Sequence, residues 1–224
     1  MTGMFPAPKV HRVPTRVGEA LRVLDWDHGG TPVVMLHPNG FCGGLYEPVA
    51  RALDGDARTI AIDLAGHGDS TTPTDPTRYR FVSMAHDVLE VLDQLGLRGI
   101  AGIGASLGGA VAALVDQLDP GRWSQLLLAE PVAFPPSLFS ADQPNPMAIA
   151  ARRRRRSFGS RDEMRAHYLS REPLSQLGAD ALDGYLQWGT IEHADGIHLA
   201  CDAARREEEF TLRENRRVKT ALVM

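Results

Sequence analysis

Four short runs of apolar and β-branched residues recur along the N-terminal part of the chain, and longer stretches with helical patterning separate them. The runs are TPVVMLH, RTIAIDL, RGIAGIG and SQLLLAE, at residues 31–37, 58–64, 98–104 and 124–130. They lack polar alternation, so we expect strands that are covered on both faces. Buried strands that alternate with helices predict an α/β fold with a mostly parallel central sheet flanked by helices.

Two further patterns extend the expected core. Apolar residues recur at helical spacing over residues 81–95, and Gly96 supplies a C-terminal stop, which predicts a helix. The sequence ALRVLDWDHGGTPVVML predicts two strands joined at Gly29 and Gly30. This antiparallel hairpin would lie at one edge of the sheet.

The pattern changes at the proline-rich stretch FPPSLFSADQPNPM, which predicts a linker. The residues after this stretch are helical in pattern, with capping-box spacing in SRDE and a turn at residues 194–196. We therefore expect three parts, a core, a helical insertion and the start of a further core strand, at residues 1–134, 135–212 and 213–224.

Composition narrows the class of protein. The 224 residues can bury one sizeable core, and 24 basic against 28 acidic residues leave a net charge of −4, which does not favour nucleic acid. Cys42 and Cys201 lack the spacing of a zinc site or a disulfide framework, so we expect a reducing cytoplasm, no metal and no cofactor. The N-terminus lacks a signal-peptide core, and no apolar run is long enough for a membrane span.

A run of five arginines at residues 152–156 is the most biased segment. Spread around a helix, these side chains cannot form one surface, so we expect a solvated helix with partly snorkelling side chains. The alternative is that one or two of the arginines face a substrate carboxylate.

The sequence GASLG at residues 104–108 matches the pattern G-x-S-x-G, with Ser106 at its centre. An apolar strand pattern precedes it and a helical pattern comes directly after it, which is the setting that a nucleophilic serine in a tight strand-to-helix turn requires. The turn demands small residues two positions before and after the serine, and Gly104 and Gly108 meet that demand. The alternative is a glycine-rich turn that only packs a strand against a helix.

Two other loops come after buried strands at the same edge of the expected sheet. After the first run, Asn39 or Gly40 can aim a backbone N–H at an oxyanion near Ser106, and the Leu107 N–H would be the second donor. After the second run, DLAGHGDS supplies a glycine-rich turn. We expect His67 in this turn to pack the loop and not to act as a base.

The ordered series LHPNGF, DLAGHGDS, GASLGG and LLLAEP resembles the α/β-hydrolase superfamily over residues 15–135, and the helical insertion resembles its cap. The resemblance implies a serine hydrolase of small ester, amide or other acyl substrates, in which Ser106 attacks the carbonyl, a histidine moves the proton and an acid orients the histidine. This chain departs from the frequent pattern at Pro38 and Ala105.

The acid and the histidine come after later strands in that superfamily, and the resemblance implies that this chain stops before two such units. Glu130 matches the acid position after the sixth strand, or it is a structural glutamate at the end of a strand. His193 and His198 come after Ser106 and Glu130 in the chain but lie in the insertion, and the loop role of His37 competes with a role as base.

Three functions therefore remain open from the sequence. The first is serine hydrolysis, and the second is a catalytically incomplete hydrolase fold that binds a ligand or partner without turnover. The third is cofactor-free oxygen or halide chemistry on the same fold. A sheet that lacks strands on one side would expose an apolar edge. We therefore expect a chain that is either marginally stable as a monomer or forms a homodimer through this edge.

Overall fold

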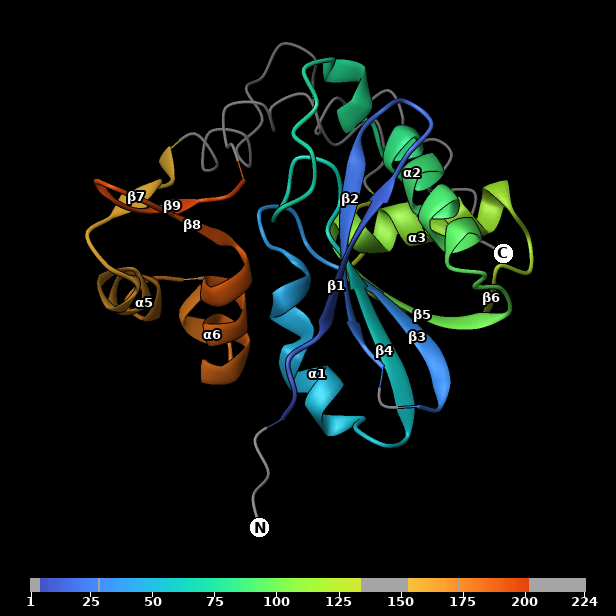
Figure 1. The fold of residues 1–224 in the computed structure, drawn as a ribbon, viewed down its shortest axis with the longest axis horizontal. Helices are drawn as coiled ribbons and strands as arrows, with labels where there is room; N and C mark the ends of the chain where they lie inside the picture. Colours follow the sequence, from blue (N-terminus) through green and yellow to red (C-terminus); the bar gives the residue numbers. More distant parts are fainter. Residues whose placement is uncertain (1–4, 28, 134–152, 173, 202–224) are drawn as a thin grey trace.

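The computed structural model describes residues 5–27, 29–133, 153–172 and 174–201. Within these residues a six-stranded sheet has the order β1-β2-β4-β3-β5-β6 (Figure 1). Its strands are Lys9–Pro14, Ala20–Trp26, Thr31–Leu36, Ala57–Ile62, Ile100–Ala105 and Trp123–Ala129 for β1 to β6. β3 to β6 are parallel, whereas β2 is antiparallel to both β1 and β4. The predicted α/β fold with a mostly parallel sheet is confirmed.

The predicted hairpin at Gly29 and Gly30 is wrong, because β4 lies between β2 and β3. A methyl group on Gly30 would lie 2.4 Å from the Asp56 carbonyl oxygen, so the chain runs here against the loop that leads into β4. β4 is buried and forms hydrogen bonds with β2 on one side and with β3 on the other. If β2 and β3 formed a hairpin, β4 could not pair with both of them. The antiparallel edge is formed instead by β1 and β2.

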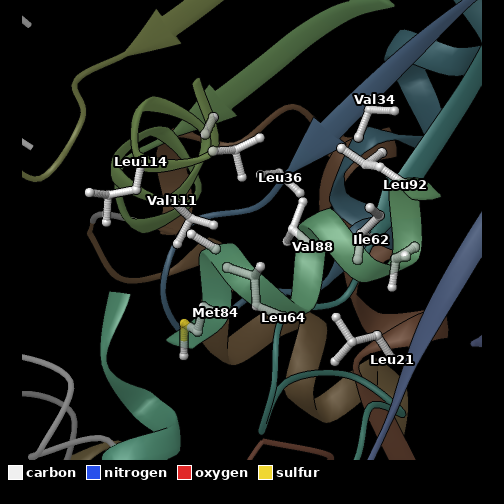
Figure 2. Packing of buried hydrophobic residues seen from close by; sticks show 14 of the residues in the cluster. Leu21, Val34, Leu36, Ile62, Leu64, Met84, Val88, Leu92, Val111 and Leu114 are labelled. Carbon is white, nitrogen blue, oxygen red and sulfur yellow. The ribbon is translucent and has the colours of Figure 1, made fainter. Parts of the chain in front are cut away.

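Helices cover both faces of the sheet (Figure 1). α2 (Phe81–Gln94) and α3 (Leu107–Leu118) pack on one face, and α1 (Glu47–Ala52) lies on the other. Side chains alternate along β3, so that Val34 and Leu36 join the cluster under α2 and α3 while Met35 joins the cluster under α1. Figure 2 shows Leu36 near Val88 of α2 and Val111 of α3, and Val34 near Leu92 of α2. Burial on both faces explains why β3 and β4 lack polar alternation. The expectation of a strand covered on both faces is wrong for β6, where residues 124–129 are exposed or half-buried.

β6 forms one border of the described sheet. It pairs with β5 and with no other described strand, and Leu127 on its surface is 63% exposed. The dimer through a sheet edge stays a prediction. The expected strand at residues 213–224 lies outside the described residues.

We call residues 153–172 and 174–201 the outer segment. It contains the helices α5 (Arg161–Leu169) and α6 (Ala179–Trp188), and Ser160 caps α5 by accepting from the Glu163 N–H. Besides the expected helices it holds a three-stranded antiparallel sheet of β7 (Ser157–Phe158), β8 (Thr190–His193) and β9 (Gly196–Leu199), with the order β7-β9-β8. The expected turn at residues 194–196 joins β8 to β9. Exposed positions along β8 explain why no strand pattern stood out.

The outer segment packs on the core through a close contact between α6 and the 3-10 helix η1 (Gly43–Tyr46). A methyl group on Gly44 would lie 2.4 Å from the Gly184 carbonyl oxygen, and one on Gly184 would lie 2.3 Å from the Gly44 carbonyl oxygen. Beside this contact, the Arg22 guanidinium donates to the Trp188 carbonyl at 2.7 Å. Two facing glycines thus let the backbones of core and outer segment approach directly.

Gly44→Ala should destabilise the protein by about 1–3 kcal/mol, because the new methyl group overlaps the α6 backbone. The measurement is the free energy of unfolding from urea titration. Gly178→Ala is the matched control in the outer segment, since no atom lies within 4 Å of its added methyl group. We expect the control to lose no more than about 0.7 kcal/mol through its helix-capping position. Equal losses in the two variants would contradict the tight contact.

Candidate active site

Ser106 lies between β5 and α3 with φ 50° and ψ −114°, a backbone conformation that residues other than glycine rarely adopt. Three backbone hydrogen bonds hold it there. Its N–H donates to the Ala129 carbonyl at 2.9 Å, and its own carbonyl accepts from the N–H groups of Ala110 and Val132, both at 3.1 Å. The surrounding main chain therefore fixes a strained serine, which is the condition under which such strain persists at functional sites.

Glycines allow this turn to form. A methyl group on Gly108 would lie 2.1 Å from the Leu36 carbonyl oxygen, and one on Gly104 would lie 2.7 Å from the Gly108 carbonyl oxygen. The Gly108 N–H also donates to the His37 carbonyl at 3.2 Å. The first turn of α3 therefore touches the end of β3, and the expected need for small residues on both sides of Ser106 is confirmed.

The loop after β3 forms a tight turn beside this contact. The Phe41 N–H donates to the Pro38 carbonyl at 3.2 Å, and Gly40 has φ 81°, as the third position of a type II turn requires. The N–H groups of Asn39, Gly40 and Leu107 donate to no acceptor among the described residues. Leu107 opens α3, where the helix leaves its first N–H groups without an intrahelical partner. The loop and the helix therefore each offer unused backbone donors.

His37 is fully buried, and both of its ring nitrogens hold loops in place. Nε2 accepts from the Leu64 N–H at 3.0 Å, and Nδ1 lies 2.8 Å from the Pro38 carbonyl oxygen. The side chain thereby joins the turn after β3 to the loop after β4. This geometry supports the loop role over that of a base.

His67 is also fully buried and lies against His37, with the ring centroids 4.9 Å apart. Its Nδ1 lies 3.0 Å from the Ala65 carbonyl oxygen, and its Nε2 lies 3.0 Å from Asn39 Oδ1. The expected packing role agrees with this environment. His67 positions the side chain of the residue whose N–H is a candidate oxyanion donor.

Glu130 comes directly after β6, is exposed and has φ 45°. Ala129, which precedes Glu130, and Val132, two positions after it, both form backbone hydrogen bonds with Ser106. The fold therefore brings the backbone of Glu130 next to Ser106. No hydrogen bond or ion pair joins its carboxylate to another described residue, and its role as the acid stays a prediction.

His193 and His198 lie on neighbouring strands of the outer segment, with ring centroids 4.7 Å apart. Nε2 of His198 lies 3.0 Å from Asp195 Oδ1. These contacts are internal to the hairpin formed by β8 and β9. The two histidines therefore pair with each other within the hairpin. A role as base, which the sequence offered only as an alternative for either residue, stays untested.

Asp63 is a buried residue of this region that the sequence did not single out. It is inaccessible to solvent, accepts from the Gly43 N–H at 2.6 Å and pairs with Arg22 at 2.6 Å. Burial, reinforced by the Asp63 charge, raises the pKa of the Cys42 thiol. Cys42 therefore stays protonated and is a poor nucleophile.

The arginine run is solvated only in part. Arg153, Arg155 and Arg156 are exposed, whereas Arg154 is half-buried and its guanidinium lies over the rings of Phe41, Tyr168 and Tyr185. The expectation of a solvated helix is therefore wrong for Arg154, and residues 154–156 lie outside the described helices. The residues that Arg154 contacts are distant in the sequence, so these contacts cannot be predicted from the run of arginines.

No group of three or more histidine, cysteine, aspartate or glutamate side chains gathers as a metal site would require within the described part of the chain. The described helices are also all too short or too polar to cross a membrane.

Comparison with known families and proteins adds independent findings. Residues 31–166 match the model of a family described as alpha/beta hydrolase fold. The chain is 33% identical over 137 residues to a serine hydrolase-like protein of Danio rerio, covering 61% of this chain and 42% of that protein. It is 34% identical over 137 residues to the non-heme chloroperoxidase CPO-A1 of Kitasatospora aureofaciens, covering 60% and 48%. The chain thus matches less than half the length of these curated relatives.

Solved structures show the same fold. The crystal structure of E-2-(acetamidomethylene)succinate hydrolase superposes with a TM-score of 0.70 at 20% identity, covering 93% of this chain and 74% of that chain. A thioesterase domain from the curacin biosynthetic pathway gives a TM-score of 0.72 at 19% identity, covering 90% and 75%. At such identities the likeness concerns the fold alone.

His67→Ala should lower the free energy of unfolding by about 1–3 kcal/mol, because it leaves the half-buried side-chain oxygen of Asn39 and the buried carbonyl oxygen of Ala65 without their partner. Urea titration measures the loss. The control is His86→Ala, which removes an exposed histidine from α2 and should change stability by less than about 0.5 kcal/mol. A His67→Ala protein as stable as the control would speak against the packing role.

Proposed function

The chain belongs to the α/β-hydrolase fold family, and we propose that it is a serine hydrolase of small ester, amide or other acyl substrates with Ser106 as the nucleophile. One observation carries the proposal. Ser106 is held at φ 50° between a buried strand and the N-terminus of a helix, where three backbone hydrogen bonds maintain the strain. A serine that only packed a turn would gain nothing from this conformation, which costs about 1–3 kcal/mol.

Backbone donors near the serine support the second part of the mechanism. When Ser106 Oγ attacks an acyl carbonyl, negative charge develops on the carbonyl oxygen and needs donors that are already in place. The Leu107 N–H opens α3, and the unused N–H of Asn39 or Gly40 would be the second donor. The positive end of the α3 dipole favours the same charge.

Glu130 takes the role of the acid in this proposal, since its backbone is adjacent to the main-chain partners of Ser106. His37 and His67 take no part in proton transfer, because their ring nitrogens are engaged with loop groups. The outer segment acts as a cap that shapes the pocket for the acyl group.

A second candidate is a hydrolase fold that binds a ligand or partner without turnover. The favouring observation is that no hydrogen bond links a described histidine to Ser106 or Glu130. Oxygen or halide chemistry is a third candidate, and the similarity to a protein named as a non-heme chloroperoxidase favours it.

A fluorophosphonate probe tests the nucleophile. Ser106 Oγ should attack the phosphorus and expel fluoride, which leaves a covalent label that mass spectrometry locates on Ser106. Ser106→Ala should lose this label completely, because the attacking oxygen is gone. Ser124→Ala, which removes an exposed serine at the start of β6, should be labelled as the wild type is. Equal labelling of wild type and Ser106→Ala would refute the assignment.

Ester hydrolysis separates the first two candidates. We expect p-nitrophenyl esters with short acyl chains to be hydrolysed by the wild type, and Ser106→Ala to lose about 10³-fold or more in rate. Circular dichroism should show that Ser106→Ala stays folded. Hydrolysis that depends on Ser106 excludes binding without turnover, whereas wild-type protein that binds an ester without hydrolysing it supports that candidate.

A further inference from the structure

The carbonyl of Gly40 is held from the outer segment. Nη1 of Arg154 donates to the Gly40 oxygen at 3.0 Å, and the Tyr185 hydroxyl donates to the same oxygen at 3.1 Å. Nη2 of Arg154 donates in turn to the Tyr185 hydroxyl at 2.8 Å. Three hydrogen bonds thus close a ring between two residues of the outer segment and one residue of the core.

The charge of Arg154 has no described carboxylate within ion-pair distance. Its guanidinium lies instead over three aromatic rings, 5.9 Å from the centroid of Phe41, 5.2 Å from that of Tyr168 and 5.6 Å from that of Tyr185. Cation–π contacts of this kind stabilise a desolvated cation and fix the plane of the guanidinium. The strongest acceptor that the cation meets is therefore the Gly40 carbonyl.

This carbonyl is one end of a chain of hydrogen bonds. It shares a peptide unit with the Phe41 N–H, which donates to the Pro38 carbonyl and closes the turn. A cation that polarises the Gly40 oxygen strengthens the donor at the other end of the same peptide. The turn that presents the Asn39 and Gly40 N–H groups is thus fixed by the core on one side and by Arg154 and Tyr185 on the other.

We propose that Arg154 and Tyr185 are positioning residues that hold the oxyanion turn, residues 38–41, in its active geometry only while the outer segment is docked. The catalytic part of this inference rests on the proposed serine hydrolase function. Docking of the outer segment through Gly44 and Gly184 would then determine both the shape of the pocket and the readiness of the oxyanion donors.

The conformational test requires no activity. We compare Arg154→Met and Tyr185→Phe with two matched controls, Arg155→Met and Tyr168→Phe. Arg155 is an exposed neighbour in the same run, and the Tyr168 hydroxyl makes no hydrogen bond to the turn, so neither control removes a bond to residues 38–41. The readouts are the ¹⁵N order parameter of the Gly40 amide and the hydrogen-exchange rate of the Phe41 amide.

In Arg154→Met and Tyr185→Phe, the Gly40 order parameter should fall from about 0.85 to about 0.6 or below. Exchange of the Phe41 amide should become about tenfold faster, because its closing bond opens more often. Both controls should match the wild type. Wild-type values for Gly40 and Phe41 in both test variants would overturn the proposal. If the Gly178 amide shows that Arg154→Met unfolds the outer segment, Tyr185→Phe decides alone.

Fluorophosphonate kinetics give the catalytic test. The maximal rate constant for labelling Ser106 should fall about tenfold in Tyr185→Phe, while the probe concentration at half-maximal rate stays the same. If Tyr185 had only a structural role, Tyr185→Phe would lower stability but leave the maximal rate constant for labelling unchanged. An unchanged maximal rate constant would overturn the catalytic part of the proposal. If the wild type is not labelled at all, the proposed hydrolase function fails, and the amide measurements still decide whether Arg154 and Tyr185 hold the turn.

Discussion

The contact between the first turn of α3 and the end of β3 is the constraint on which the site depends. The α3 backbone approaches the Leu36 carbonyl so closely that only glycine fits at position 108. This approach places the N-terminus of α3 beside the loop after β3 and forces the chain through the strained conformation at Ser106. The strain costs about 1–3 kcal/mol, and three backbone hydrogen bonds of about 1 kcal/mol each offset it.

Most of the sheet was predictable, because strands buried on both faces leave apolar runs that a sequence shows directly. The order of the strands was less so. The Gly29 and Gly30 pair looked like a hairpin because hairpin rules are local, whereas the pairing that wins places β4, from farther along the chain, between β2 and β3. The sheet of the outer segment gave no signal either, since β8 has mostly exposed positions and so lacks a hydrophobic pattern.

The site shows the same division between local and distant information. Ser106 and its glycines could be predicted because the strand, the turn and the helix that define them are contiguous in sequence. Arg154 could not, since its neighbours in the chain are other arginines and its contacts come from Gly40 and Tyr185. Asp63 carries no local signal for a similar reason, because its partner Arg22 lies on β2.

Two arginines bridge the core and the outer segment, and their electrostatic settings differ. The charge of Arg22 in the core is neutralised by the buried carboxylate of Asp63. Its hydrogen bond to the Trp188 carbonyl therefore attaches the outer segment to the core but brings little net charge to that carbonyl. Arg154 of the outer segment meets no described carboxylate, so its charge acts on the Gly40 carbonyl. A neutralised arginine can anchor the outer segment but hardly polarises a peptide, whereas a cation paired only with rings and a carbonyl does both. The second bridge is therefore the one through which docking of the outer segment would reach the oxyanion turn.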